Sequence, residues 1–259
     1  MNLLHLVQRP PRVQLLFLHL PRTGGDSLSR ALSEVYLFDF LRPRRKFIFS
    51  FSANASRLTA GLHGLTDAQI RDVVLHYGLL TDSSMRLVLG HFRYTAKIID
   101  RLGSAWSLAT VLREPTSRWL SEYYYNRYKK SDHYKTNLDL DSYLESPAGK
   151  AGGCCYVTRF LSEAPAGDSI EVTQSMIAEA KRNIDRVNVL GLFEQFDDFL
   201  NRLRGLLDRR LYVGHYNSNP APLVIRERKL DAATQRRIEA LCAPDTEIYQ
   251  YARHLLSLG

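Results

Sequence analysis

One stretch decides the fold of this chain, Leu16-Phe-Leu-His-Leu-Pro-Arg-Thr-Gly-Gly-Asp-Ser-Leu28. It contains most of an apolar run over 13–20 that is typical of a buried strand, breaks at Pro21, and enters a helical pattern over 27–36. A strand, a glycine turn and a helix N-terminus form an anion site, because several N–H groups point outward and the helix dipole favours negative charge. Arg22 adds a permanent cation. The stretch predicts a phosphate or sulfate site, and the alternative is a turn that merely joins a strand to a helix.

The loop differs from two better-known phosphate loops. A Walker A loop places Lys directly before the hydroxyl residue that binds Mg²⁺. Here the cation precedes the glycines, and Asp26 stands where that Lys would be. The dinucleotide pattern G-x-G-x-x-G is also absent. Neither HExxH nor a paired-Cys pattern occurs, so we expect no catalytic metal.

A second motif follows another apolar run, Ser107 to Leu112. It reads Arg113-Glu-Pro-Thr-Ser-Arg-Trp-Leu-Ser-Glu-Tyr-Tyr-Tyr125. Because Pro115 suits the first turn of a helix, Arg113 is expected at the end of the strand and Ser121 about two turns into the helix. The two side chains can meet one anion if the helix packs back across the strand end, where open α/β sheets bind ligands. The alternative makes Arg113 and Arg118 surface partners of Glu114 and Glu122.

Together these motifs resemble those of the PAPS-dependent sulfotransferases. The segment Phe17-x-His-x-Pro-Arg-Thr-Gly-Gly-Asp-Ser27 is similar to their 5′-phosphosulfate loop, as found in the heparan sulfate 2-O- and 6-O-sulfotransferase branch of carbohydrate O-sulfotransferases. The segment Val111-Leu-Arg-Glu-Pro-x-x-Arg-x-x-Ser-x-Tyr-Tyr-Tyr125 resembles their 3′-phosphate motif. Weaker similarities are 188–194 with the amphipathic helix after it, Asn217, and 245–249, so the resemblance covers about 13–255.

The resemblance implies a cofactor, a product and a set of ligands. The cofactor would be 3′-phosphoadenosine 5′-phosphosulfate (PAPS), and the product adenosine 3′,5′-bisphosphate. Arg113 and Ser121 would hold the 3′-phosphate. The 5′-phosphosulfate would be held by residues of the first loop, namely Arg22, Thr23, Gly24, Gly25, Asp26 and Ser27.

The chain departs from the family at two of these positions. Arg22 replaces a Lys that contacts the bridging oxygen, and Arg can neutralise the leaving phosphate but is a poor proton donor. Asp26 replaces a hydroxyl residue, and its charge suits a helix N-terminus but repels a nearby sulfate unless it points away or pairs with a cation. The resemblance therefore implies nucleotide binding, and the two departures argue against full catalytic activity.

A base for the acceptor hydroxyl is the remaining requirement. His91 follows the short apolar run 87–90, so it is expected at a strand end that faces the same crevice as Arg22 and Arg113. It resembles the Gly-His element of the 2-O-sulfotransferases, in which the His is the catalytic base. The alternative is a strand-end His bonded to a backbone carbonyl. His19 is expected to pack against or orient the turn, and Arg159 either adds charge to the site or is an ordinary surface cation.

Composition supports one α/β domain. The chain has 259 residues, of which 45% are hydrophobic, enough for a full core and too many for general disorder. Alternating segments predict a mainly parallel sheet flanked by helices. The resemblance implies that this sheet is P-loop-like and that 1–259 form a single sulfotransferase domain. The segment 135–153, rich in glycine, is expected to be a mobile loop. Strands are expected near 13–20, 47–50, 86–90, 107–112 and 187–192.

The net charge is +8, with a basic cluster at Arg42, Arg44, Arg45 and Lys46. Such a surface suits an anionic partner, and an acidic glycan is one option, but no nucleic-acid motif accompanies the charge. The apolar patch over 1–7 is too short to span a membrane and lacks a signal-peptide layout. We therefore expect no transmembrane segment and a cytoplasmic, bacterial-type soluble protein, with a trimmed Golgi luminal domain as the alternative.

The predicted function is transfer of a sulfuryl group from PAPS to a hydroxyl, on a glycan or another hydroxyl-bearing acceptor, by in-line displacement with His91 as base and Arg22 at the leaving phosphate. Two alternatives stay open. A catalytically weak nucleotide-binding homologue is favoured by Arg22 and Asp26. A nucleotide-dependent phosphoryltransferase is disfavoured by the missing Walker Lys.

Overall fold

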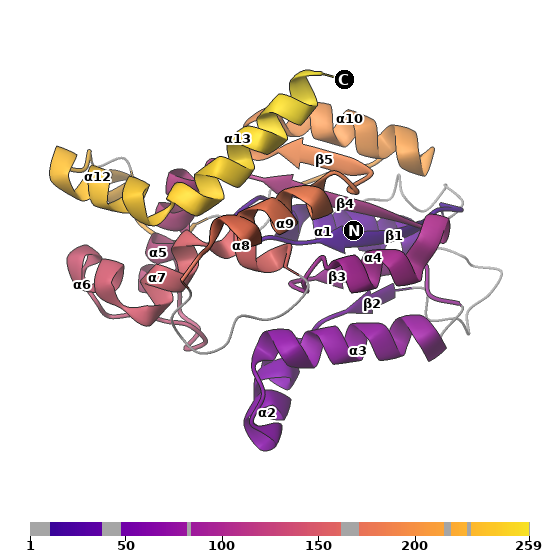
Figure 1. The fold of residues 1–259 in the computed structure, drawn as a ribbon, viewed down its shortest axis with the longest axis horizontal. Helices are drawn as coiled ribbons and strands as arrows, with labels where there is room; N and C mark the ends of the chain where they lie inside the picture. Colours follow the sequence, from indigo (N-terminus) through magenta and orange to yellow (C-terminus); the bar gives the residue numbers. More distant parts are fainter. Residues whose placement is uncertain are drawn as a thin grey trace.

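The centre of the molecule is a five-stranded, all-parallel sheet with the order β2-β3-β1-β4-β5 (Figure 1). The computed structural model describes residues 11–37, 48–81, 84–161, 171–214, 219–226 and 229–258. The predicted parallel α/β sheet is confirmed, and all five predicted strands are present. Most strand ends differ from their predicted positions by one or two residues. The strands are β1 (Gln14–Leu18), β2 (Ile48–Ser50), β3 (Leu87–Gly90), β4 (Trp106–Leu112) and β5 (Val189–Leu192).

Several features of the sequence lie outside the described residues. These are the apolar patch over 1–7, Phe47, and the segments that contain the basic cluster at 42–46 and Asn217.

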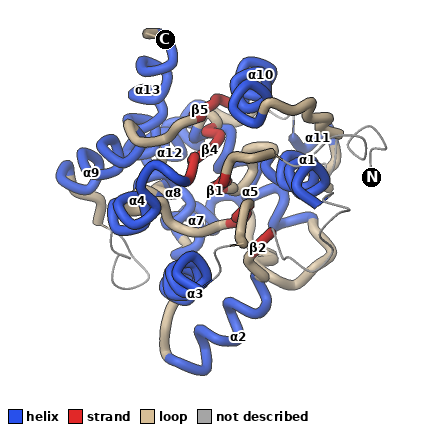
Figure 2. Tube along the Cα trace, turned by 90° about the vertical axis from the view of Figure 1, so that its right-hand side faces the viewer, coloured by secondary structure: helices blue, strands red, loops and turns tan. Residues whose placement is uncertain are grey.

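Both faces of the sheet are buried, because successive side chains of a strand point to opposite faces. Leu15 and Phe17 of β1 point to one face, which α1 (Gly25–Leu37) and α10 (Phe196–Leu207) cover. Leu16 and Leu18 point to the other face, which is covered by α4 (Ala96–Leu102), α8 (Cys155–Arg159), α9 (Gln174–Ile184) and α13 (Ala243–Ser257). The sheet therefore forms the middle layer of three (Figures 1 and 2).

A third apolar cluster lies beside the sheet and supports α5 (Pro115–Tyr128). Trp119 and Tyr123 of this helix pack there with side chains of α6 (Leu140–Glu145) and α12 (Ala232–Leu241). The other helices are α2 (Ala53–His63), α3 (Asp67–Thr81), α7 (Pro147–Gly153) and α11 (Leu223–Arg226), with 3₁₀ turns at Gly103–Ala105 and Phe193–Gln195.

The expectation of a mobile loop over 135–153 is wrong. Asp139 and Ser146 cap two helices, α6 and α7, by accepting from the backbone N–H groups of Ser142 and Gly149. The glycines serve close packing, since a Cβ at Gly149 would lie 1.9 Å from the Tyr143 carbonyl oxygen. They therefore allow backbone segments to touch and do not make this segment flexible.

No helix in the described part of the chain is long and apolar enough to cross a membrane.

Candidate functional site

The topology of the sheet brings three loops to one edge. From β1 the chain moves to the β2 and β3 side, and after β3 it crosses β1 to reach β4. Strand β1 pairs with β3 and with β4, so the residues after Leu18, Gly90 and Leu112 emerge next to one another. Crevices at such a reversal of strand order are the usual ligand sites of parallel α/β sheets.

The turn between β1 and α1 has the geometry of an anion-binding loop. Arg22 and Gly24 have φ values of 65° and 78°, and the Thr23 hydroxyl donates to the Leu20 carbonyl at 2.9 Å. The chain then enters α1 at Gly25, where the N–H groups of the first turn have no carbonyl partner within the helix. Two observations favour glycine at position 24. Its φ is positive, and a Cβ there would lie 3.1 Å from the Phe193 ring.

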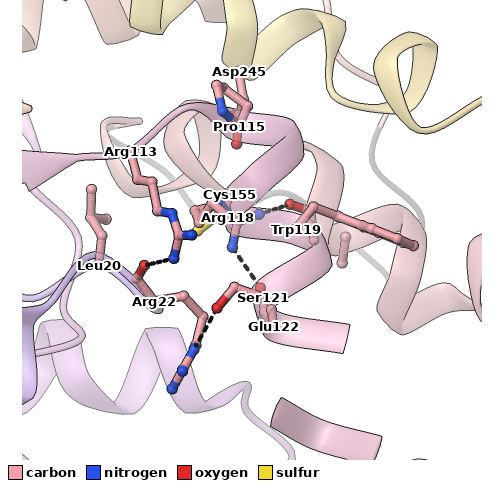
Figure 3. A network of polar contacts seen from close by, with 12 residues as sticks. Leu20, Arg22, Arg113, Pro115, Arg118, Trp119, Ser121, Glu122, Cys155 and Asp245 are labelled. Atoms are coloured by element: carbon pink, nitrogen blue, oxygen red, sulfur yellow. Dashed lines mark hydrogen bonds and ion pairs between the residues drawn. The ribbon is translucent and has the colours of Figure 1, made fainter. Parts of the chain in front are cut away.

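The Arg22 side chain bridges this turn and helix α5. Its Nε donates to Ser121 Oγ at 3.3 Å (Figure 3), and its guanidinium carbon lies 4.2 Å from the centre of the Tyr125 ring. Ser121 and Tyr125 are four residues apart on α5 and therefore share one face of the helix. Helix α5 therefore lies beside the turn that follows β1.

Arg113 reaches the same turn from the end of β4. Its Nη1 donates to the Arg22 carbonyl at 3.1 Å (Figure 3), and its guanidinium carbon lies 4.8 Å from the centre of the Phe193 ring. The Tyr156 hydroxyl fixes the backbone at this point, accepting from the Arg113 N–H at 2.8 Å and donating to its carbonyl at 2.6 Å. Burial lowers the pKa of the Arg113 and Arg22 side chains from 12.5, although both remain cationic near neutral pH.

Neither guanidinium has a carboxylate within ion-pair distance in the described residues. Glu114, the alternative partner of Arg113, instead caps α5 by accepting from the N–H groups of Thr116 and Ser117 at 2.9 and 2.7 Å. Two partly buried cations beside a helix N-terminus favour an anion between them. The alternative that assigned Arg113 to Glu114 is therefore wrong.

Arg118 lies on the same helix but is enclosed by protein. Its side chain is fully buried, donates to Glu122 Oε2 at 2.5 Å and also contacts the Gly152 carbonyl. The predicted pairing with Glu122 is confirmed, whereas the predicted surface position is wrong. Arg118 serves the interior of the protein, near the buried carboxylate of Asp245.

His91 lies at the carboxyl end of β3. Its Nδ1 contacts the His19 carbonyl oxygen. Because a carbonyl can only accept, Nδ1 carries the proton and Nε2 keeps a lone pair, and Nε2 has no hydrogen-bond partner among the described residues. The predicted alternative, a bond from His91 to a backbone carbonyl, is therefore present. This bond uses Nδ1 and leaves Nε2, the nitrogen that a base would use, available. Burial, then His19 and Arg159, lower the pKa of His91 well below 6.5.

Two arginines hold the backbone of His91. Arg71 Nη1 and Arg159 Nη1 donate to its carbonyl oxygen at 3.0 and 3.2 Å. Farther along the loop, the buried Arg93 pairs with Asp72 of α3. Arg159 therefore lies beside His91, and helix α3 fixes the loop that carries His91.

His19 connects the loop that carries His91 to the turn between β1 and α1 (residues 20–24), which we call the anion loop. Its ring lies 4.4 Å from the His91 ring, centre to centre, and a Cβ at Gly25 would lie 1.9 Å from His19 Cδ2. Burial lowers the pKa of His19 to about 4, so the ring is neutral at pH 7. Its Nε2 lies 3.7 Å from Asp26 Oδ1, which at that pH is a contact and not an ion pair. Because His19 packs on the turn, Gly25 is required there, and the predicted orienting role agrees with this geometry.

Three residues near the site were not predicted to act there, namely Tyr125, Phe193 and Arg71. The spacing of Tyr125 from Ser121 is a usable signal, since residues i and i+4 share a helix face. Phe193 and Arg71 approach from elements far away in the sequence, and no local pattern identifies them.

No model of a known protein family matches this sequence, and a search of curated proteins found no match. Within the described residues, no group of three or more His, Cys, Asp and Glu side chains is arranged to hold a metal ion.

Proposed function

We propose that the chain is a PAPS-dependent O-sulfotransferase that acts on a hydroxyl of a glycan or a related acceptor. The observation that carries the proposal is the meeting of Arg22, Arg113 and Ser121 at the sheet edge, with both guanidiniums free of carboxylates within the described residues. Two separate anionic groups fit this arrangement, one at the N-terminus of α1 and one between Arg113 and Ser121. A nucleotide with phosphates at its 5′ and 3′ positions has such groups.

The residues would then divide the work as follows. Backbone N–H groups of 23–27 bind the 5′-phosphosulfate, while Arg113 and Ser121 bind the 3′-phosphate. Arg22 lies between the two sets and neutralises the charge that develops on the departing phosphate. Its αL backbone is set by the turn, and the stack on Tyr125 fixes its side chain. Asp26 is about half exposed and lies toward His19, which reduces its repulsion of a bound sulfate.

His91 Nε2 would accept the proton of the acceptor hydroxyl. The bond between sulfur and the phosphate oxygen breaks as the bond between sulfur and the acceptor oxygen forms, and the proton moves to Nε2. The low pKa of His91 keeps the ring neutral and ready to accept across the neutral range. Arg71 and Arg159 hold its carbonyl, so the ring position does not depend on the substrate.

Calorimetric titration with adenosine 3′,5′-bisphosphate tests the binding half of the proposal. We expect metal-independent binding that exceeds that of 5′-ADP. Arg113→Ala is expected to weaken it by roughly 10- to 100-fold, because a charge-assisted bond contributes about 1.5–3 kcal/mol. Arg202→Ala is the matched control, because it removes a cation from the exposed side of α10, and it should bind the nucleotide like the wild type. Stronger binding of 5′-ADP with Mg²⁺ would instead favour a phosphoryltransferase.

Replacement of His91 tests the catalytic half. His91→Ala should lower kcat by about 10²- to 10⁴-fold on an acceptor found by screening with labelled PAPS, and leave nucleotide affinity unchanged. The carbonyl that Arg71 and Arg159 contact is retained, so the loop keeps its anchors. In the wild type, kcat/KM should stay level from pH 8 down past 6.5, because the pKa of His91 is lowered. His254→Ala, on the exposed side of α13, is the control. Wild-type turnover by His91→Ala would exclude His91 as the base.

A further inference from the structure

Helices α2 and α3 form a hairpin whose outer side is apolar and exposed. Leu62, Tyr77 and Val73 are 83%, 70% and 61% exposed, values unusual for large apolar side chains. We call the set the hairpin surface, and its members are Leu58, Leu62, Leu65, Val73, Val74, Tyr77 and Leu80.

The exposed side chains are ordered along each helix. On α3, Val73, Tyr77 and Leu80 recur at spacings of four and three residues, opposite the buried Arg71 and Leu75. On α2, Leu58 and Leu62 are four residues apart and lie opposite the buried Ser56 and Ala60. Figures 1 and 2 both show the hairpin at the edge of the molecule, projecting from the sheet and the other helices.

The hairpin surface also lacks charge. Residues 53–81, all within the described part of the chain, contain four Asp, Glu, Lys or Arg residues, namely Arg57, Asp67, Arg71 and Asp72. Arg71 and Asp72 are buried, and Asp67 contacts Arg71 and the Tyr134 hydroxyl. Arg57 alone of the four is exposed. Charge depletion around aromatic and aliphatic side chains distinguishes the core of protein interfaces from ordinary surface.

We propose that the hairpin surface is the interface of a homodimer, with a second copy of this chain as its occupant. Its seven members are between 38% and 83% exposed, and so large a set of exposed apolar side chains suits the centre of a standard interface, which buries about 800 Å² on each partner. A two-fold interface places one surface against itself, so a charge-free apolar face needs no complementary partner. A membrane surface fits less well, because interfacial helices are rich in exposed Lys and Arg, and this hairpin has Arg57 alone.

The position of the hairpin gives such a dimer a second effect. The inner side of α3 carries Arg71 and Asp72, which hold the loop of His91 and Arg93. A partner packed on the outer side of α3 would hold this helix against the loop. The dimer itself does not depend on the proposed sulfotransfer, and its test uses no substrate.

Sedimentation velocity of the full chain, at about 1–100 µM and physiological salt, tests the proposal. The wild type should sediment with twice the chain mass of 29.7 kDa. Tyr77→Glu and, separately, Leu62→Glu should raise the dimer dissociation constant roughly tenfold or more, because each puts a charge into the apolar centre of the interface. Leu258→Glu is the matched control, since it adds the same charge at a side chain that is 72% exposed near the end of α13.

Far-ultraviolet circular dichroism and urea midpoints establish that the variants are folded. A wild-type chain that stays monomeric at 100 µM would overturn the proposal. So would a Tyr77→Glu and a Leu62→Glu chain that both dimerise as tightly as the wild type. Flotation with vesicles that contain phosphatidylserine separates the membrane alternative, which predicts a monomer in solution whose vesicle binding is lost in Tyr77→Glu and kept in Leu258→Glu.

Discussion

Arg113 and Arg118 lie on one short segment, yet the protein uses them in opposite ways. Arg113 ends β4, is partly exposed, and donates to a backbone carbonyl of the anion loop. Arg118 is one turn into α5, has no exposed surface, and pairs with Glu122 beside the buried Asp245. Among the described residues, Arg113 has no carboxylate within ion-pair distance at the sheet edge, whereas Arg118 is neutralised inside the fold.

This difference separates a binding residue from a structural one on physical grounds. A buried charge is tolerated only when it is paired and hydrogen-bonded, so Arg118 must have its partners in the protein. A cation that keeps access to solvent can wait for an external anion, and pairing it internally would occupy the same donors. Burial and pairing together, and not residue type, therefore support the proposal that Arg22 and Arg113 bind an external anion.

The largest expected effect is the loss of stability in Arg118→Met. Removing this cation takes away the ion-pair partner of Glu122 and the positive charge near the buried Asp245, and breaking a buried pair costs about 3–5 kcal/mol. Arg113→Met should change the free energy of unfolding by about 1 kcal/mol or less, because Arg113 has no ion pair among the described residues and its charge repels that of Arg22. Urea denaturation of both variants measures the two effects.

The companion variant Arg118→Met with Asp245→Asn sharpens the result. Removing both charges should recover part of the stability that Arg118→Met loses, since no unpaired buried carboxylate remains. An equal loss in Arg118→Met and Arg113→Met would contradict the division into a structural and a binding arginine.

The sequence was sufficient for the framework of the site. Apolar runs that end at Pro21, His91 and Arg113 predicted three of the strands and placed their ends together, because parallel strands finish at one edge of a sheet. Pro115 located the start of α5, and the spacing to Ser121 followed from helical geometry. These are local signals, and the structure confirms them.

What the sequence did not predict depends on segments that are distant along the chain. The burial of Arg118 results from Gly152 and from the region of Asp245, 127 residues away. Gly153 belongs to the segment that was predicted to be a mobile loop, but a Cβ at this position would lie 2.6 Å from the Leu241 carbonyl oxygen. The Ser146-Pro147 pair that begins α7 is a local start signal and could have corrected the loop assignment.

The two regions also differ in their response to pH, which gives the smaller test. Burial lowers the pKa of His19, at the open edge, to about 4 from 6.5. The unfolded chain therefore binds more protons there between pH 4 and 6.5, so this histidine lowers stability as the pH falls through that range. Burial raises the pKa of Asp245, in the interior, to about 7 from 3.8. The folded chain then binds more protons between pH 3.8 and 7, so this carboxyl raises stability as the pH falls.

Because the two contributions oppose each other, the wild type alone does not reveal either. His19→Phe keeps a ring against Gly25 but cannot bind a proton, so it should gain about 2–3 kcal/mol relative to the wild type between pH 7.5 and 4.5. Asp245→Asn should lose stability relative to the wild type as the pH falls through the same range. Urea midpoints at several pH values measure both. A wild-type minus His19→Phe difference that is the same at pH 4.5 and 7.5 would mean that the edge histidine protonates as freely in the folded protein as in the unfolded chain, and the neutral His19 that packs on the anion loop would have to be given up.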